Sequence, residues 1–132
     1  MASDYIEQAV RVRLLADSNI TSIVGERIYY MEVPAIVTYP YVLIQTISDP
    51  DNNMYCGKDG SNPRLQIDSV DENESLTDVK ALDKAIRTSM NDFSGTMDGI
   101  TVYLVERGGF RELREDEKII RLSRDFIINY ER

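Results

Sequence analysis

Apolar residues recur near the start of the chain at the spacing of a helix. Over residues 5–16 they fall at every fourth position and form one stripe, made of Ile6, Val10 and Leu14. Asp4 precedes this stripe as the expected N-cap, and Glu7, three residues later, completes a capping box. A short turn is predicted over 18–24, with Gly25 as a C-cap. The chain is therefore predicted to begin with a helix that buries one face.

Residues 41–48 form the clearest predicted strand, because apolar side chains occupy both of its faces. Two apolar faces are typical of a strand in the middle of a sheet. Other strands are predicted over 27–31, 65–70, 100–106 and 119–130. In the last of these, apolar residues alternate with polar ones, but Arg124 falls on the apolar face. That position predicts either a β-bulge or a paired arginine.

A second amphipathic helix is predicted over 76–91, with Ser75 as its N-cap. The order helix, strands, helix, strands is typical of the α+β class. We therefore expect an antiparallel or mixed β-sheet of about four to five strands with the two main helices packed on one face. The length of 132 residues fits a single domain that spans residues 1–132.

Two long loops are predicted, over residues 49–63 and 107–118. The first is rich in Asp, Asn, Gly and Pro, which favour turns, and the second is rich in charged residues. Both are longer than the usual hairpin connection of about 2–5 residues. Nothing in their composition offsets the entropy that is lost when they become ordered. We therefore expect both loops to be mobile in the isolated chain and to become ordered against a partner surface.

The composition excludes several classes of enzyme. Histidine is absent, which removes the commonest general base and metal ligand and excludes Ser-His-Asp catalysis, Cys-His catalysis and His-based zinc sites. Cys56 is the only cysteine, so no intrachain disulfide forms, and it has no His to activate it as a nucleophile. The chain contains no apolar run of roughly 18 residues and no basic, apolar leader at its start. We expect no enzymatic activity and no cofactor.

The charge is strongly acidic and unevenly spread. The net charge is −8, and residues 49–78 hold eight acidic and two basic side chains, a local charge of −6. Such a stretch indicates a surface that repels DNA. Asp49, Asp51 and Asn53 begin like a calcium loop, but Met54 and Gly60 stand where that loop needs Gly and Glu. A looser divalent-metal module remains an alternative, with four candidate carboxylates: Asp49, Asp51, Asp68 and Asp71.

Four segments of the chain, taken in order, resemble a known family. They are Ala9–Tyr30, Pro40–Asp49, Arg64–Ser69 and the terminal strand Arg124–Glu131. Together with the second amphipathic helix, they are similar to the tail-completion, or tail-terminator, proteins of long-tailed bacteriophages (siphophages). The likeness covers nearly the whole chain. It is carried by hydrophobic patterns and not by a catalytic signature.

The resemblance implies a structural virion protein with no enzymatic activity. It implies a homo-oligomer, a hexameric ring at the head-proximal end of the tail, which terminates the tail tube and joins it to the head connector. The implied partners are the major tail-tube protein, the head-completion or connector protein and the tape-measure protein. DNA would pass through the channel without specific binding, no membrane is involved, and assembly would take place in the host cytoplasm. A head-completion or neck connector protein is the alternative within the same particle.

Charged and aromatic residues of the two loops, together with Arg64 just after the first loop, are the candidate interface: Asp49, Asp51, Tyr55, Lys58, Asp59, Arg64, Arg107, Arg111 and Arg114. We expect the last three arginines to pair with the acidic stretch 49–78 of an adjacent copy. Such pairing would orient neighbouring subunits head to tail.

Overall fold

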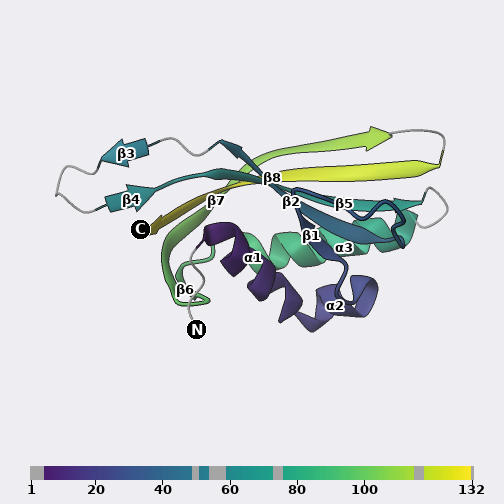
Figure 1. The fold of residues 1–132 in the computed structure, drawn as a ribbon, viewed down its shortest axis with the longest axis horizontal. Coiled ribbons are helices and arrows are strands. Elements are labelled where there is room, and N and C mark those ends of the chain that lie inside the picture. The colour runs from purple at the N-terminus through teal and green to yellow at the C-terminus, as the bar shows by residue number, and fades with distance from the viewer. Residues whose placement is uncertain (1–4, 49–50, 54–58, 73–75, 115–117, 132) are drawn as a thin grey trace.

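The computed structural model describes residues 5–48, 51–53, 59–72, 76–114 and 118–131, and for 51–53 and 59–61 it describes the backbone only. Within these residues the chain forms three helices and eight strands (Figure 1). The helices are α1 (Ile6–Leu15), α2 (Ser18–Val24) and α3 (Leu76–Met90). The strands are β1 (Ile28–Tyr30), β2 (Tyr41–Ser48), β3 (Asp51–Asn53), β4 (Asp59–Ser61), β5 (Arg64–Glu72), β6 (Gly95–Met97), β7 (Ile100–Arg114) and β8 (Ile119–Glu131).

All eight strands belong to one mixed sheet. β1 pairs with β2 in parallel, and every other described pairing is antiparallel. β5 and β4 pair in turn with the same edge of β8, because β7 occupies the other edge along nearly its whole length. The β3–β4 hairpin therefore continues the β2–β5 pair, and it projects beyond the body of the protein (Figure 1). The α+β class is confirmed, with more strands than the four to five expected.

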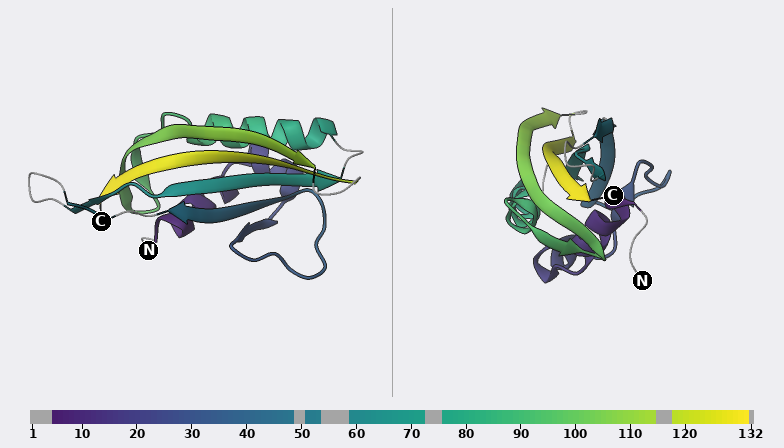
Figure 2. Two further views of the ribbon diagram at one scale, coloured as in Figure 1. Left: turned by 90° about the horizontal axis from the view of Figure 1, so that it is seen from above. Right: turned by 90° about the vertical axis from the view of Figure 1, so that its left-hand side faces the viewer.

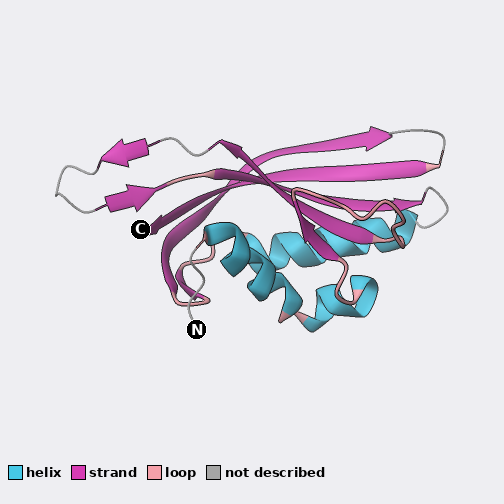
Figure 3. Cartoon of the chain, in the orientation of Figure 1, coloured by secondary structure: helices cyan, strands magenta, loops and turns pink. Residues whose placement is uncertain are grey.

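The three helices cover one face of the sheet (Figure 3). Between the two layers lies the main core, which draws buried side chains from both main helices and from the central strands. Val10 and Leu14 of α1, Ile86 of α3, Ile44 of β2 and Phe126 of β8 are all part of it. Burying each such side chain stabilises the fold by about 1.5–3 kcal/mol. The apolar stripes that predicted the two long helices are the surfaces that this core uses.

The opposite face of the sheet carries a smaller apolar cluster under the connector 31–40, which we call the strap. Tyr41, Leu43 and Val70 form its buried part, and Val33 and Val37 of the strap pack against them. Neighbouring tyrosine rings complete the cluster, with centroids 5.6 and 6.0 Å apart. Because β2 has one apolar face against the helices and one under the strap, its predicted place inside the sheet is confirmed.

Short-range signals at the first helices are only partly confirmed. Tyr5 is the N-cap residue of α1 and makes no capping hydrogen bond with its side chain, whereas the expected caps Asp4 and Ser75 lie outside the described residues. The predicted turn is in fact the helix α2, whose N-cap Asp17 accepts a hydrogen bond from the Asn19 N–H at 2.9 Å. Gly25 ends it with a positive φ of 61°, as its place in the sequence predicted.

The expectation of a loop over 107–118 is wrong for its first eight residues. β7 continues to Arg114 and stays paired with β8, ending with Arg114 opposite Ile120. The charged residues that suggested a loop lie on an exposed strand, where polar side chains are as well accommodated as in a loop. The other expected loop, 49–63, contains β3 and β4. Residues 49–50, 54–58 and 115–117, where the rest of both loops was expected, lie outside the described part.

A β-bulge in β7 interrupts its regular pairing with β8. The register between β7 and β8 shifts between Arg107 and Phe110, at the pair Gly108–Gly109. A Cβ on Gly108 would lie 2.7 Å from the Cβ of Asp125 and 2.9 Å from its carbonyl oxygen, whereas a Cβ on Gly109 would meet nothing within 4 Å. Only glycine allows this close approach of the two backbones at residue 108.

Of the two explanations offered for Arg124, the paired arginine is confirmed. β8 runs against β5 with an unbroken register from Glu72–Ile119 to Arg64–Ile127. Arg124 points to the helical layer and donates from Nε and Nη2 to the two carboxylate oxygens of Asp83 on α3, each at 3.0 Å. The ring of Phe110 lies 4.3 Å from its guanidinium carbon. A bidentate pair of this kind satisfies both charges inside the layer.

Candidate functional site

The nine residues expected at an interface do not form one cluster. Asp49, Tyr55 and Lys58 lie outside the described residues, and Asp51 and Asp59 lie in the backbones of β3 and β4. This hairpin projects at one end of the molecule, whereas the far end of β7, which carries Arg114, lies at the other (Figure 1). An intramolecular contact between the hairpin and the end of β7 is therefore excluded by distance.

Two of the four predicted arginines are engaged within their own chain. Arg64 donates from Nη1 to the Asp125 carboxylate at 3.1 Å, and its side chain is 38% exposed. Arg111 donates from Nη2 to the side-chain oxygen of Gln66 at 3.3 Å. Both arginines therefore stabilise the face of the sheet that lies away from the helices. Their availability for a neighbouring subunit is reduced.

The centre of that polar face is an ion pair that the sequence did not reveal. Arg121 donates to Asp68 at 2.6 Å, and the Asp68 side chain is only 1% exposed. Gln66 also donates to both oxygens of Asp68, at 2.9 and 3.1 Å. A buried carboxylate requires such partners because its desolvation is costly. Asp68 therefore has a structural role in joining β5 to β8.

The remaining two arginines lie on the exposed part of β7. Arg107 is 3.8 Å from Asp92, and both side chains are more than half exposed. Arg114 has no hydrogen-bond or ion-pair partner among the residues that the structure describes. Exposed pairs at such distances contribute little to stability. These two positions retain most of their capacity to bind another molecule.

Arg114 borders an open groove between β7 and the first turns of α3, with a volume of about 280 Å³. Its lining combines apolar and charged side chains: Leu76, Lys80, Glu112, Leu113, Arg114 and Ile120. Leu76 and Leu113 are each 42% exposed. Lys80 and Glu112 lie 3.9 Å apart across the groove. The groove therefore brings apolar and charged residues together, as protein interfaces do.

The second edge of β7 borders the same region. β6 pairs with β7 only at Ile100–Val102, and the loop after α3 bonds with the backbone of Val105. From Glu106 to Arg114, no strand among the described residues pairs with this edge. A row of unpaired backbone groups is a ready site for contact with another chain.

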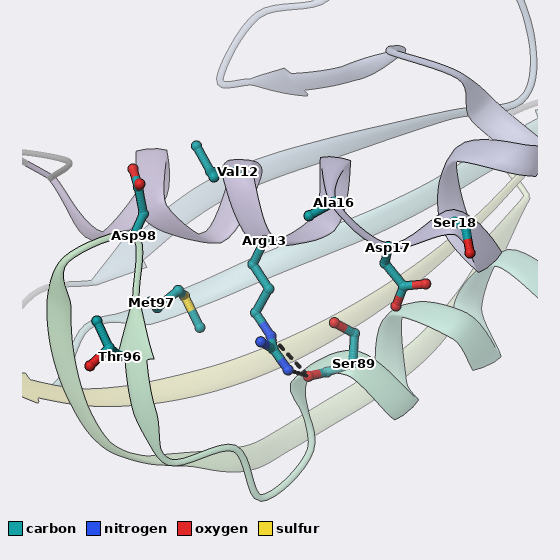
Figure 4. Close-up of a pocket in the computed structure, with 9 residues that line it drawn as sticks. All are labelled: Val12, Arg13, Ala16, Asp17, Ser18, Ser89, Thr96, Met97 and Asp98. Carbon is teal, nitrogen blue, oxygen red and sulfur yellow. Dashed lines mark hydrogen bonds between the residues drawn. The ribbon is translucent and has the colours of Figure 1, made fainter. Parts of the chain in front are cut away.

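A second cavity, of about 470 Å³, lies where the ends of α1 and α3 meet the β6 hairpin. Figure 4 shows Arg13 reaching from α1 to the carbonyl oxygen of Ser89, to which its Nε and Nη2 donate at 3.1 and 2.8 Å. The same guanidinium lies 3.9 Å from the ring centre of Phe93. Burial lowers the pKa of Arg13, and nearby Asp17 partly opposes this effect. The contacts of Arg13 hold the last turn of α3 against α1.

Of the four carboxylates considered for a metal module, only Asp68 and Asp71 have described side chains, and each has a role within the sheet. Asp68 is occupied by Arg121, and Asp71, three residues on, is also buried, with its Oδ1 accepting from the Glu72 N–H at 2.7 Å. Asp49 lies outside the described residues, and Asp51 lies in the projecting hairpin. Among the described residues, no three or more Asp, Glu, Cys or His side chains are placed to hold a metal ion.

Asp71 has an unusual environment for a carboxylate. It is 2% exposed, and its Oδ2 has no hydrogen-bond partner among the residues described. Burial raises the pKa of Asp71, and the nearby Asp78 and Glu72 raise it further, against the lowering effect of the Glu72 N–H. The charged form of Asp71 is therefore disfavoured in the folded chain.

None of the helices in the described part of the chain has the length and apolar composition that a membrane crossing requires.

What the structure offers is a covered sheet with a projecting hairpin, an open strand edge and a groove. The family model for the tail completion protein gp17 matches residues 8–131 of this sequence. The chain belongs to this tail-completion family. It is a structural protein of the virion tail, as its resemblance had indicated.

A comparison with solved structures supports the fold. A chain from the virion of a native gene transfer agent particle has a TM-score of 0.83 with this structure and covers 96% of this chain and 95% of its own length. The two sequences are 16% identical, so the likeness concerns the fold alone. Among curated proteins, none matches the chain.

Proposed function

We propose that the chain forms a ring at the head-proximal end of the tail, where it terminates the tail tube and joins it to the head connector. Membership of the tail-completion family is the observation that carries this proposal. The six-fold symmetry, the single-domain organisation over residues 1–132 and the absence of enzymatic activity are parts of the same proposal. Its partners are further copies of the chain, the major tail-tube protein, the connector protein and the tape-measure protein.

The two sides of the sheet support a ring. One side ends in the open edge of β7, and the other ends in the short strand β1 and the strap (Figure 2). Because these two sides differ, a contact between them joins the front of one copy to the back of the next. Head-to-tail contacts of this kind close into rings when the rotation between copies divides a full turn.

Charge supports both the interface and the channel. Arg107 and Arg114 remain exposed on β7, while the stretch 49–78 carries a charge of −6 in the sequence, to which the buried Asp68 and Asp71 contribute no exposed carboxylate. Pairing between these regions of adjacent copies would fix the orientation of each copy in the ring. The acidic surplus that remains would repel the DNA that passes through the channel, and no specific DNA contact is needed. The nine predicted interface residues are proposed on this basis.

Image reconstruction of purified virions tests the ring. We expect density for this chain at the head-proximal end of the tail, with cyclic symmetry. Density at the distal tip, or a single copy per tail, would overturn the proposal. In an infection that lacks the chain, complete heads and unjoined tails should accumulate separately.

Fractionation separates this function from that of a neck protein. A mutant phage that makes tails without heads should still carry the chain on its tails. If the chain is found instead on heads that lack tails, it belongs to the head-completion complex.

A further inference from the structure

The strap carries the most exposed large apolar side chain among the described residues. Ile36 is 93% exposed, whereas its neighbours Val33 and Val37 pack against the cluster on the sheet. Pro34 lies between them, and residues 33–48 contain no charged side chain. The strap is therefore fixed to the sheet by the residues that flank Ile36. An isoleucine side chain that is held in contact with water in this way gives the free chain no stability.

The groove between β7 and α3 lies across the molecule from the strap (Figure 2). In Figure 2, the strap projects beyond β2 on one side, while α3 and β7 lie on the opposite side in both views. The strap and the first turns of α3 also lie toward the same end of the strands (Figure 1). The strap and the groove therefore lie on opposite sides of the molecule and at a similar height along the strands. When copies are placed side by side around an axis parallel to the strands, the strap of one copy meets the groove of the next.

The chemistry of the two patches is complementary. The groove offers the apolar side chains of Leu76 and Ile120 in a volume of about 280 Å³, which is ample for the four carbons of an isoleucine side chain. Leu113 also lines the groove, but its register opposite Arg121 places its side chain on the other face of the sheet. Glu32, at the start of the strap, is exposed and has no described partner, and the same is true of Arg114 at the rim of the groove. One apolar contact and one pair of opposite charges would thus be made together.

We propose that Ile36 of each copy inserts into the groove formed by Leu76 and Ile120 of the next copy, with Glu32 beside the neighbour's Arg114. This inference rests on the proposed ring and names the contact that closes it. The partner is a second copy of this chain. The contact is heterologous, so each copy donates one strap and receives one.

Cysteine cross-linking in assembled virions tests the contact. Cys56→Ser removes the only native thiol and serves as the parent. Three variants are made in it: Ile36→Cys, Leu76→Cys and the two together, since Leu76 lines the groove and is exposed. Virions are treated with a short bismaleimide and analysed on denaturing gels. We expect the double variant to give a ladder up to the full ring, and each single variant to remain monomeric, because neither residue meets its own copy in a head-to-tail contact.

The outcomes separate the contact from the ring itself. A ring seen in reconstructions of the double variant, but no ladder, overturns the contact and leaves the proposed function intact. Cross-linked dimers from Ile36→Cys alone would mean a two-fold contact and also overturn it. If the virions contain no ring, the proposed function fails as well.

Substitution by aspartate is an independent test of the contact. Ile36→Asp places a charge in the apolar groove and should reduce joined, infectious particles at least tenfold. Tyr5→Asp is the matched control, since Tyr5 is also exposed but is the N-cap of α1 and belongs to neither patch. Circular dichroism should show both variants folded like the parent. An equal yield of particles from the two variants would contradict the proposal.

Discussion

Asp83 and Arg124 show how one ion pair lies within an otherwise apolar layer. Their side chains are 12% and 16% exposed, and both carboxylate oxygens are used. Arg124 could be singled out from sequence because it breaks the alternation of β8. Its partner was harder to recognise, because Asp83 lies next to Leu82 and either residue fits the stripe of α3. The pattern of one strand identifies a charged residue on an apolar face. Its partner depends on how that strand packs against an element that is distant in sequence.

Replacing Arg124 by Met leaves Asp83 buried without a counter-charge. We expect the free energy of unfolding to fall by about 3–5 kcal/mol, the usual cost of breaking a buried pair. Urea denaturation at pH 7 measures this loss. The double variant Asp83→Leu/Arg124→Met removes both charges and should recover most of it. A single variant with the midpoint of the parent would show that the pair is unimportant.

Asp71 gives the chain a stability that depends on pH. Because its folded pKa is raised above the unfolded value, the folded chain holds the proton more tightly. The favourable contribution is fully present below the unfolded pKa and is lost as pH rises through the folded pKa. At pH 7, above the unfolded pKa, the buried acid therefore lowers the stability of the fold, and Asp71→Asn should be more stable than the parent.

The difference between Asp71→Asn and the parent should narrow as the pH is lowered through the pKa of Asp71. Urea denaturation at a series of pH values checks this. Glu26→Gln, which removes an exposed acid that does not act on Asp71, is the control and should change the stability little at any pH. A constant advantage of Asp71→Asn at every pH would mean that packing, and not ionisation, is responsible.

Among the elements, those with a strong local pattern were predictable. The two long helices, the central strand β2 and the terminal strand β8 each have apolar residues at the period of their structure. The short strands β3, β4 and β6 have no such pattern, since pairing with a neighbour defines them. The same holds for residues 107–114, whose charges suggested a loop although β8 holds them in the sheet. Pairing across the sheet thus overrides local composition.

The bulge in β7 offers a test at the scale of the β7–β8 hairpin. Gly108→Ala would place a methyl group 2.7 Å from the Cβ of Asp125, so one strand must shift. We expect a loss of about 1–3 kcal/mol in the free energy of unfolding, as for other overpacked sites. Gly109→Ala faces open space and should change stability by less than about 0.5 kcal/mol. Thermal unfolding of the two variants compares them, and equal midpoints would contradict the role of Gly108.

For the whole molecule, the sequence predicted the family and the fold class better than it predicted which residues make contacts. The nine candidate interface residues were chosen from two expected loops, but Arg64 and Arg111 bind within their own chain. The groove beside Arg114 and the exposed strap depend on which elements meet at each side of the sheet. Such surfaces combine residues far apart in sequence, as Leu76 and Leu113 do, and no local pattern reveals them.

A charge swap tests the proposed contact between whole subunits. Glu32→Arg or Arg114→Glu alone would place like charges together, which costs several kcal/mol at a close contact. Joined particles should fall at least about tenfold for each. The double variant Glu32→Arg/Arg114→Glu restores opposite charges and should recover joining, as counted by infectious particles in complementation. If the double variant is as poor as the two single ones, these residues do not face each other.

The bulged, charged edge of β7 also bears on how the free protein avoids polymerising. Between Glu106 and Arg114 the edge carries five charged residues, and Gly108–Gly109 bends it away from a flat strand. Charges and bulges on an open edge discourage random pairing with other strands. Head-to-tail contacts otherwise risk growing into open filaments when closure fails. If the proposed ring forms, the same residues that leave this edge unpaired would protect free subunits from fibre formation before assembly.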